Sequence, residues 1–226
     1  MNDINVKVDY EYTSNPFTAI RWLNSLGPTA AFDFETASKY STADKTRYEL
    51  ELETSNDRAR KRILRQRISS TGLSHPSLSR LTHISFADCD NFARIIILDK
   101  PLITRRVLHW LTTTNRLQVW HNATFDFKFI YYYTGKFPRY YEDSQQLAKS
   151  VINHVNVWKA NTQLKLLMGH KYGAWAVTAD KFVQDNLFDE DLIKYAGYDA
   201  CACFALWNAQ QQYLKETNAV QDTINS

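Results

Sequence analysis

Two acidic residues separated by one position, Asp33 and Glu35, stand in the otherwise apolar stretch AAFDFETAS, residues 30–38. If this stretch is a β-strand, both carboxylates point to the same side, because side chains on a strand alternate with a period of two. Neighbouring carboxylates repel each other and are costly to bury, and hard oxygen ligands at this spacing suit Mg²⁺ or Mn²⁺. The alternative is an exposed strand edge on which both acids are solvated.

Two later segments also place a carboxylate among aromatic or small residues. In HNATFDFKFIYYY, Asp126 lies between two phenylalanines, and on a helix it would share a face with Asn122, which could orient it by hydrogen bonding. In DLIKYAGYDACACFALW, Asp199 would share a helical face with Tyr195, and small neighbours leave room for a close approach. Taken alone, Asp126 could face solvent, and the second pair could be a packed tyrosine and a surface acid.

Taken together, the acids have the composition of a two-metal site for phosphoryl transfer. Two divalent ions about 3.5 to 4 Å apart can clamp a scissile phosphate. A tyrosine with its ordinary pKa of about 10 stays protonated and can hold the attacking water in line, which is the role expected of Tyr195. The carboxylates expected to bind the metals are Asp33, Glu35, Asp126 and Asp199.

The remaining sequence predicts the elements that must position these residues. Ser14 or Asn15 as a cap, Pro16 in the first turn and Gly27 at the end predict a short helix before the strand at 30–38. Strand patterns return at 81–88 and 93–99, as in a meander, and again at 117–122. Helices are expected over 102–115, 123–135, 142–153, 162–170 and about 190–215.

Strands therefore come early in the chain and helices late, which predicts an α/β fold with a central mixed sheet flanked by helices. The 226 residues are 44% hydrophobic and 14% aromatic, enough for one sizeable globular core. We expect residues 1–226 to form a single domain, with a charged insertion at about 39–80 after the first strand.

The insertion contains DRARKRILRQR, a basic run with no acid between residues 58 and 67, and three glutamates precede it. If it is helical, Arg58, Arg62 and Arg65 suit phosphate contacts beside the active site. The alternatives are a solvated arm that pairs with the preceding glutamates and a surface for a partner protein.

The composition of the chain limits the partners and the cellular location that we expect for it. The formal charge of +3 permits a polyanionic partner without requiring one. The cysteines Cys89, Cys201 and Cys203 have no zinc-type spacing, and the last two are expected in the core. No apolar run reaches the length of a membrane span, and the polar start of the chain is unlike a targeting peptide. We expect a cytoplasmic protein of a bacterial or phage-infected cell, with no membrane partner.

The three acidic segments resemble, in order, the three motifs of the DEDD 3′-to-5′ exonucleases. FDFETA matches D-x-E, HNATFD matches N-x-x-x-[FY]-D, and YAGYD matches Y-x-x-x-D, whose tyrosine is typical of the DEDDy group. Within that group the chain looks most similar to the proofreading domain of bacterial and phage DNA polymerase I-type (family A) enzymes. YEDSQQLAKSVIN and YAGYDACACFALW resemble that domain's segment after the second motif and its terminal helix.

The resemblance implies an RNase H-like fold and two bound Mg²⁺ or Mn²⁺ ions on the four acids named above. Tyr195 matches the residue that orients the attacking water, and Asn122 matches an asparagine near the 3′-terminal nucleotide. Thr36 and Ala37 lie where the backbone of the family meets the terminal ribose. Where the family often has a bulky apolar residue, this chain has Lys39 and a tyrosine, so the side chain that stacks on the last base is left open.

The activity implied is release of nucleoside 5′-monophosphates from single-stranded or frayed 3′ ends of DNA. Because no polymerase region follows, we expect a free-standing phage-type nuclease that proofreads during DNA replication beside a separately encoded DNA polymerase, or processes DNA independently. An RNase D-like exoribonuclease has the same DEDDy residues and is the first alternative. A catalytically silent, polymerase-associated nucleic-acid-binding module is the second. The IYYYTG run is expected to be the packed and rim face of a helix rather than a base-stacking platform.

Overall fold

The computed structural model describes residues 7–39, 42–68, 75–151 and 186–224. Its centre is a six-stranded mixed sheet in the order β1-β4-β3-β2-β5-β6. β2, β3 and β4 pair antiparallel, whereas β1, β5 and β6 join in parallel at the two edges. The strands are β1 (Asp9–Thr13), β2 (Thr29–Ser38), β3 (Ser79–Ala87), β4 (Phe92–Ile97), β5 (Leu117–Trp120) and β6 (Tyr141–Asp143).

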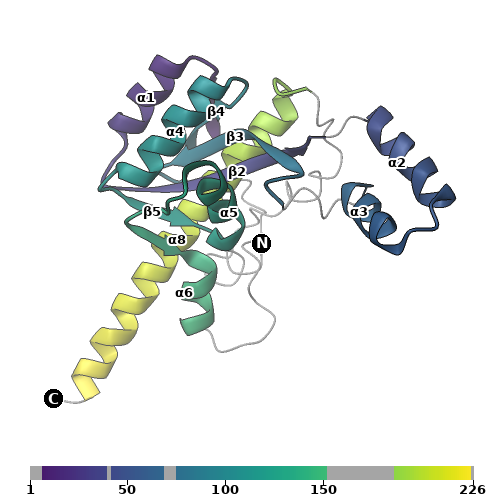
Figure 1. The fold of residues 1–226 in the computed structure, drawn as a ribbon. Coiled ribbons are helices and arrows are strands. Elements are labelled where there is room, and N and C mark those ends of the chain that lie inside the picture. The colour runs from purple at the N-terminus through teal and green to yellow at the C-terminus, as the bar shows by residue number, and fades with distance from the viewer. Residues whose placement is uncertain (1–6, 40–41, 69–74, 152–185, 225–226) are drawn as a thin grey trace.

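Helices cover both faces of the sheet (Figure 1). α1, α4 and α5 pack on one face and share its largest hydrophobic core, while α8 packs on the other face. The predicted α/β class, with a mixed sheet flanked by helices, is therefore confirmed. These helices are α1 (Pro16–Ser25), α4 (Pro101–Thr113), α5 (Ala123–Thr134), α6 (Ser144–Val151) and α8 (Glu190–Ile224).

β2 separates apolar from acidic side chains by simple alternation. Phe32 and Phe34 belong to the core beneath α1, α4 and α5, and both rings contact Trp120, with centroids 5.5 and 5.6 Å away. Since neighbouring side chains on a strand point to opposite faces, Asp33 and Glu35 lie on the side covered by α8. The aromatic packing on one face thus fixes where the two carboxylates point on the other.

α8 approaches the sheet closely at Gly197. A Cβ atom at this position would lie 3.4 Å from Cδ1 of Ile95 and 3.5 Å from Cβ of Ala93, which is ordinary van der Waals contact, so the helix lies close against β4 here. The backbone of α8 is therefore near the sheet at this position. The flanking residues Tyr195 and Asp199 are brought toward β2 by this approach.

Several boundaries differ from the sequence-based expectations. Residues 9–13 form β1, a short and mostly exposed edge strand whose side chains give no apolar alternation, so the acidic strand is the second and not the first. Residues 141–143 form β6 although 142 and 143 were expected in a helix, and α8 continues past 215 to Ile224. The helix expected at 162–170 lies outside the described residues.

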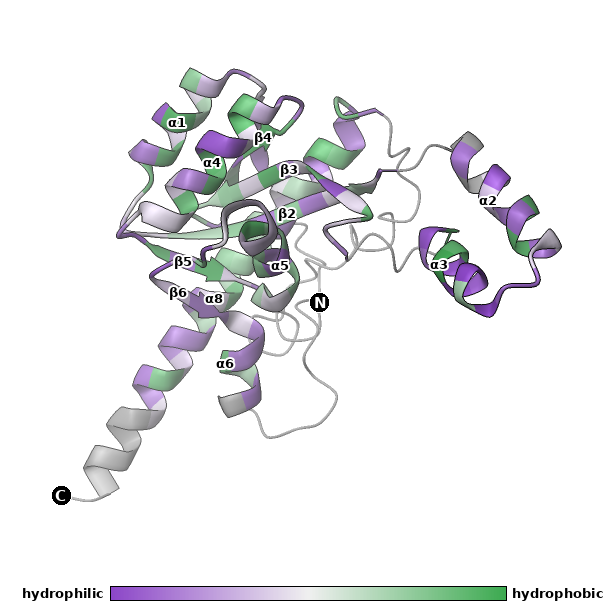
Figure 2. Cartoon of the chain, in the orientation of Figure 1, coloured by the Kyte–Doolittle hydropathy of each residue, from purple (hydrophilic) through white to green (hydrophobic). Residues whose placement is uncertain are grey.

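The insertion is a pair of helices, α2 (Thr42–Thr54) and α3 (Arg58–Ile68), which we call the α2–α3 arm. The basic run is helical, which the sequence analysis considered only as a condition for phosphate contacts, and α2 was not expected. Figure 1 shows the arm projecting from the sheet, and the colours of Figure 2 show that many of its residues are hydrophilic. The N–H of Lys39 donates to the carbonyl of Leu78 (3.0 Å), so the two ends of the insertion meet at the end of the strand that carries Asp33 and Glu35.

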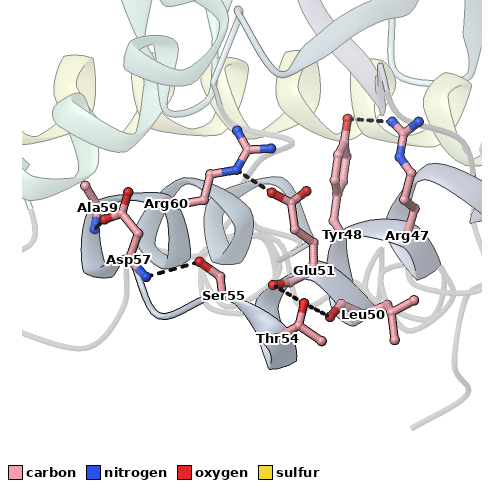
Figure 3. Close-up of polar contacts among 9 residues, drawn as sticks. All are labelled: Arg47, Tyr48, Leu50, Glu51, Thr54, Ser55, Asp57, Ala59 and Arg60. Carbon is pink, nitrogen blue, oxygen red and sulfur yellow. Dashed lines mark hydrogen bonds and ion pairs between the residues drawn. The ribbon is translucent and has the colours of Figure 1, made fainter.

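Contacts inside the arm divide the basic residues of α3 into two groups. Leu64 is fully buried against α2, and Arg60 Nε donates to Glu51 Oε1 at 2.6 Å (Figure 3). Arg67 lies over the ring of Tyr48, 5.2 Å from its centroid. Arg60, Leu64 and Arg67, which are spaced four and three residues apart, therefore form the face of α3 that packs on α2.

Candidate active site

The acidic residues of three separate elements meet on the α8 side of β2. One carboxylate oxygen from each of Asp33, Glu35 and Asp199 lies within 4.8 Å of the others. Asp126, in the first turn of α5, adjoins this group, because its Oδ1 accepts a hydrogen bond from the N–H of Phe34, between the two acids of β2 (3.3 Å). The structure thus brings together all four carboxylates that the motifs singled out, which we call the acidic centre.

The start of α5 is held by a residue that the sequence analysis did not assign to the site. The carboxylate of Asp143 accepts hydrogen bonds from the N–H groups of Asn122 (3.1 Å) and Ala123 (3.0 Å), which precede and begin the helix. It also accepts from the N–H of Gln145 (2.9 Å) and so caps α6 as well. Asp143 therefore fixes the position of α5 and with it that of Asp126.

The sequence analysis considered that Asn122 could orient Asp126 from one turn earlier on the same helix, but Asn122 lies outside that helix. It precedes the helix in a left-handed conformation (φ 64°, ψ 49°), which asparagine tolerates better than most residues, and its side chain is exposed. The hydrogen bond that orients Asp126 comes from the backbone of Phe34 instead. Asn122 remains beside the acidic centre, and its predicted contact with a terminal nucleotide stays a prediction.

The acidic centre carries strong mutual repulsion. Burial, and then the charge of Asp199, raise the pKa of Asp33 well above its usual range. Burial and the charge of Asp33 raise the pKa of Glu35 and of Asp126 in the same direction. Among the described residues, no lysine or arginine forms an ion pair with these three acids, and Glu35 Oε1 is buried without a hydrogen-bond partner.

This arrangement fits a divalent cation. Buried carboxylates are normally paired with a cation or coordinate a metal, and an unsatisfied buried oxygen is costly. Oxygen-only ligands at this spacing match the preference of Mg²⁺ and Mn²⁺. Asp33, Glu35 and Asp199 would hold one ion, with Asp126 beside them for a second. Their role as ligands stays a prediction.

Tyr195 lies one helical turn before Asp199 and is hydrogen-bonded to it. Burial raises its pKa far above the ordinary value, and the charges of Asp199 and Glu35 raise it further. The hydroxyl group consequently stays protonated at any physiological pH. It is a permanent hydrogen-bond donor and acceptor at the edge of the acidic centre, as its predicted role requires.

Two further residues line the acidic centre without having been predicted there. His83 on β3 is the register partner of Glu35; it is fully buried, with Nε2 2.7 Å from the carbonyl oxygen of Leu187. Burial lowers its pKa, so the ring stays neutral. Cys203, expected in the core, is indeed buried, but burial and then the charge of Asp33 raise its pKa, which disfavours a thiolate ligand. No sequence motif marks His83, because its position depends on the pairing of β2 with β3.

The remaining predicted residues lie at increasing distances along the chain from the acids. The pairing of β2 with β3 shifts register between Glu35 and Thr36, and Ala37 beyond it is buried. Such a bulge re-aims the side chains that follow, next to the acids. The predicted phosphate-binding arginines are exposed on α3 and are not part of the acidic centre: Arg58, Arg62 and Arg65.

Comparison with known proteins supports the fold. No protein-family model matches the sequence, and no curated protein matches it. Among solved structures, Brucella melitensis NrnC with bound Mg²⁺ is similar at a TM-score of 0.56 and 12% identity, covering 97% of this chain and 86% of that one. Trypanosoma brucei RNase D in complex with RNA U12 is similar at 0.61 and 13%, covering 91% and 63%. Escherichia coli RNase D, an exoribonuclease involved in structured RNA processing, is similar at 0.60 and 14%, covering 94% and 46%.

Identities this low establish a shared fold and not a shared activity. The chain has the RNase H-like fold of these nucleases, which confirms the predicted fold class. The finer resemblance to polymerase I-type proofreading domains receives no support from these structures. The described part of the chain has no helix that is long and apolar enough to span a membrane.

Proposed function

We propose that this protein is a metal-dependent 3′-to-5′ exonuclease that releases nucleoside 5′-monophosphates from nucleic acid. One observation carries the proposal: carboxylates from β2, α5 and α8 converge without a cationic partner for Asp33, Glu35 or Asp126 among the described residues. Two divalent cations bound there would polarise the scissile phosphate and neutralise the charge that develops on its oxygens. The likeness in fold to RNase D and to Mg²⁺-bound NrnC supports the same class of reaction.

The residues of the chain then have distinct tasks. Asp33, Glu35, Asp126 and Asp199 bind the cations, and the backbone N–H of Phe34 holds Asp126 in place. The protonated hydroxyl of Tyr195 orients the attacking water. The neutral, buried ring of His83 adds no charge to the centre.

The proposal has two forms, which differ in whether the substrate is DNA or RNA. The motif resemblance favours DNA, with action beside a separately encoded DNA polymerase in the cytoplasm of a bacterial or phage-infected cell. The structural neighbours favour RNA, because two of them are RNase D and one of those is in complex with RNA. RNA is supported at least as well as DNA.

A digestion ladder tests the proposal and its two forms together. The experiment uses 5′-labelled RNA and DNA oligonucleotides of identical sequence with Mg²⁺ or Mn²⁺, and compares wild type with Asp33→Ala. The expected result is stepwise shortening from the 3′ end that the variant abolishes, with the faster ladder identifying the sugar. If wild type binds both oligonucleotides but shortens neither, the protein is a silent binding module.

The arm supplies the second part of the proposed substrate contact. Arg58, Arg62 and Arg65 follow one another at intervals of four and three residues and are exposed, so they form one outer face of α3. No ion pair to an acid is seen for them among the described residues, in contrast to Arg60. We propose that this face contacts phosphates of the strand that leads to the acidic centre.

A further inference from the structure

Large aromatic side chains are concentrated on the surface at the end of α5 and in the connection to β6. Exposed apolar residues scattered singly need no explanation, but six large exposed rings within residues 131–141 indicate a contact surface. The IYYYTG run was expected to be the packed and rim face of a helix, and its three tyrosines are about half exposed. We call the group the aromatic surface; its members and exposed fractions are Tyr131 (52%), Tyr132 (54%), Tyr133 (42%), Phe137 (53%), Tyr140 (54%) and Tyr141 (48%).

Several of these rings are held in place by contacts that continue into the core. Tyr131 stacks on Phe137 with centroids 4.9 Å apart and an interplanar angle of 17°. Phe127, which is 8% exposed, contacts Phe137 at 6.2 Å and Tyr141 at 4.7 Å. Phe127 in turn packs against Trp120 at 5.6 Å. Rings held in this way lose little conformational entropy when a ligand stacks on them.

The exposed charges on the segment that carries most of the aromatic surface, residues 123–141, are positive. Lys128, Lys136 and Arg139 are exposed, whereas the only acid in the segment from 123 to 141 is the buried Asp126. Lys39 Nζ lies 5.4 Å from the ring centroid of Tyr132. Aromatic faces interleaved with cations suit a ligand that has both flat bases and a phosphate backbone.

Two elements connect the aromatic surface with the acidic centre. On α5, Tyr131 to Tyr133 follow Asp126 by five to seven residues, which is roughly 8 to 11 Å along a helix axis. On the exit of β2, Lys39 follows Glu35 by four residues and contacts Tyr132. A strand whose 3′ end lies at the acids could therefore extend directly onto these rings.

We propose that the aromatic surface binds the bases of single-stranded nucleic acid by stacking, upstream of the 3′ end. The polarity of the strand rests on the proposed function; the stacking itself does not. Stacking accepts any base, since every base presents a π-face, so this surface would act without sequence preference.

The test measures binding of a fluorescein-labelled oligo(dT) 12-mer and of an abasic 12-mer with the same number of phosphates. The full chain carries Asp33→Ala throughout, so that hydrolysis does not interfere. Against this background, Tyr131→Ser combined with Tyr132→Ser should weaken binding of oligo(dT) about 5- to 50-fold, given the usual strength of base–aromatic stacking. Binding of the abasic 12-mer should stay unchanged.

Two matched variants control for general damage. Tyr131→Phe combined with Tyr132→Phe keeps both rings and should retain affinity, and Tyr213→Ser removes a similarly exposed ring (43%) far along α8 and should change nothing. Equal losses with both oligonucleotides, or no loss with either, would overturn the proposal.

The outcome is independent of the proposed function. If wild type hydrolyses nothing but the serine variants lose affinity for oligo(dT) alone, the stacking surface stands and the exonuclease proposal fails. If wild type hydrolyses 3′ ends but the serine variants lose no affinity, the exonuclease stands and the stacking surface fails.

Discussion

The acidic centre and the α2–α3 arm differ in whether their charged side chains have partners of opposite charge. In the centre, Asp33, Glu35 and Asp126 repel one another, and burial raises their pKa values. In the arm, the hydrogen bond between Glu51 and Arg60 lowers the pKa of the acid and raises that of the base. The acidic centre thus brings carboxylates together away from solvent, whereas the arm pairs an acid with a base near solvent.

The difference indicates where function constrains the sequence. Buried like charges destabilise a fold, so a structure that keeps them needs a compensating ligand. Exposed ion pairs contribute little to stability, and their loss is tolerated. Substitutions in the acidic centre should therefore have large effects on activity, whereas substitutions in the arm should have small and salt-dependent effects on binding.

The largest effect is expected from loss of a carboxylate in the acidic centre. Asp126→Asn keeps the shape of the side chain but removes a negative ligand, so hydrolysis of 5′-labelled oligonucleotides should fall about 10³-fold or more with either Mg²⁺ or Mn²⁺. Asp90→Asn, at an exposed aspartate, is the matched control and should leave the rate unchanged. Retained hydrolysis in Asp126→Asn would remove that acid from the mechanism.

Tyr195→Phe should have the next largest effect. Without the hydroxyl group the water loses its orientation, so kcat should fall about 10²-fold while oligonucleotide binding stays the same. Single-turnover hydrolysis and equilibrium binding measure the two quantities separately, and Tyr213→Phe on the same helix is the control. Parallel losses in kcat and binding would show that Tyr195 only supports the structure.

The parts of the centre that depend on local geometry were predictable from the sequence. The common side of Asp33 and Glu35 follows from the period of a strand, and that of Tyr195 and Asp199 follows from the helical repeat. Both relations hold whatever the rest of the chain does. The apolar patterns of β2, β3 and β4 were equally informative, because these strands are buried.

The parts that depend on tertiary contacts were not predictable. Asp143 caps α5 only because the ends of β5 and β6 are neighbours, and His83 faces Glu35 only because of the β2–β3 register. β1 was missed because an exposed edge strand has no apolar alternation. The exposure of Tyr131 depends on what covers the end of α5, which no local pattern encodes.

Removal of metal should reveal the repulsion in the acidic centre as a loss of stability. Glu35→Gln removes one buried charge, so in EDTA at pH 7.5 its Tm should exceed that of wild type by about 2 to 8 °C. Added Mn²⁺ should raise the Tm of wild type more than that of the variant. Glu49→Gln, at an exposed position in the arm, should match wild type throughout. A lower Tm for Glu35→Gln in EDTA would contradict the uncompensated charge.

The pH dependence of this effect has a definite sign. The pKa of Glu35 is higher in the folded than in the unfolded chain, so the folded state binds more protons and metal-free wild type loses stability as pH rises from about 4 through the raised pKa. The advantage of Glu35→Gln should therefore shrink as pH is lowered toward 5. Thermal unfolding in EDTA at several pH values measures it.

The smallest effects on oligonucleotide binding are expected from substitutions in the arm. They distinguish the exposed face of α3 from the face that packs on α2. If the outer face of α3 contacts phosphates, Arg62→Gln and Arg65→Gln should each weaken oligonucleotide binding about 2- to 5-fold at low salt and reduce the slope of log K against log salt by about 0.7 to 0.9. Arg60→Gln removes the same formal charge from the face that pairs with Glu51, so it should leave the slope nearly unchanged. Equal slopes for all three variants would mean that the arm acts through its total charge. A reduced slope for Arg62→Gln and Arg65→Gln alone would identify a face that the α2–α3 packing turns outward toward the nucleic acid.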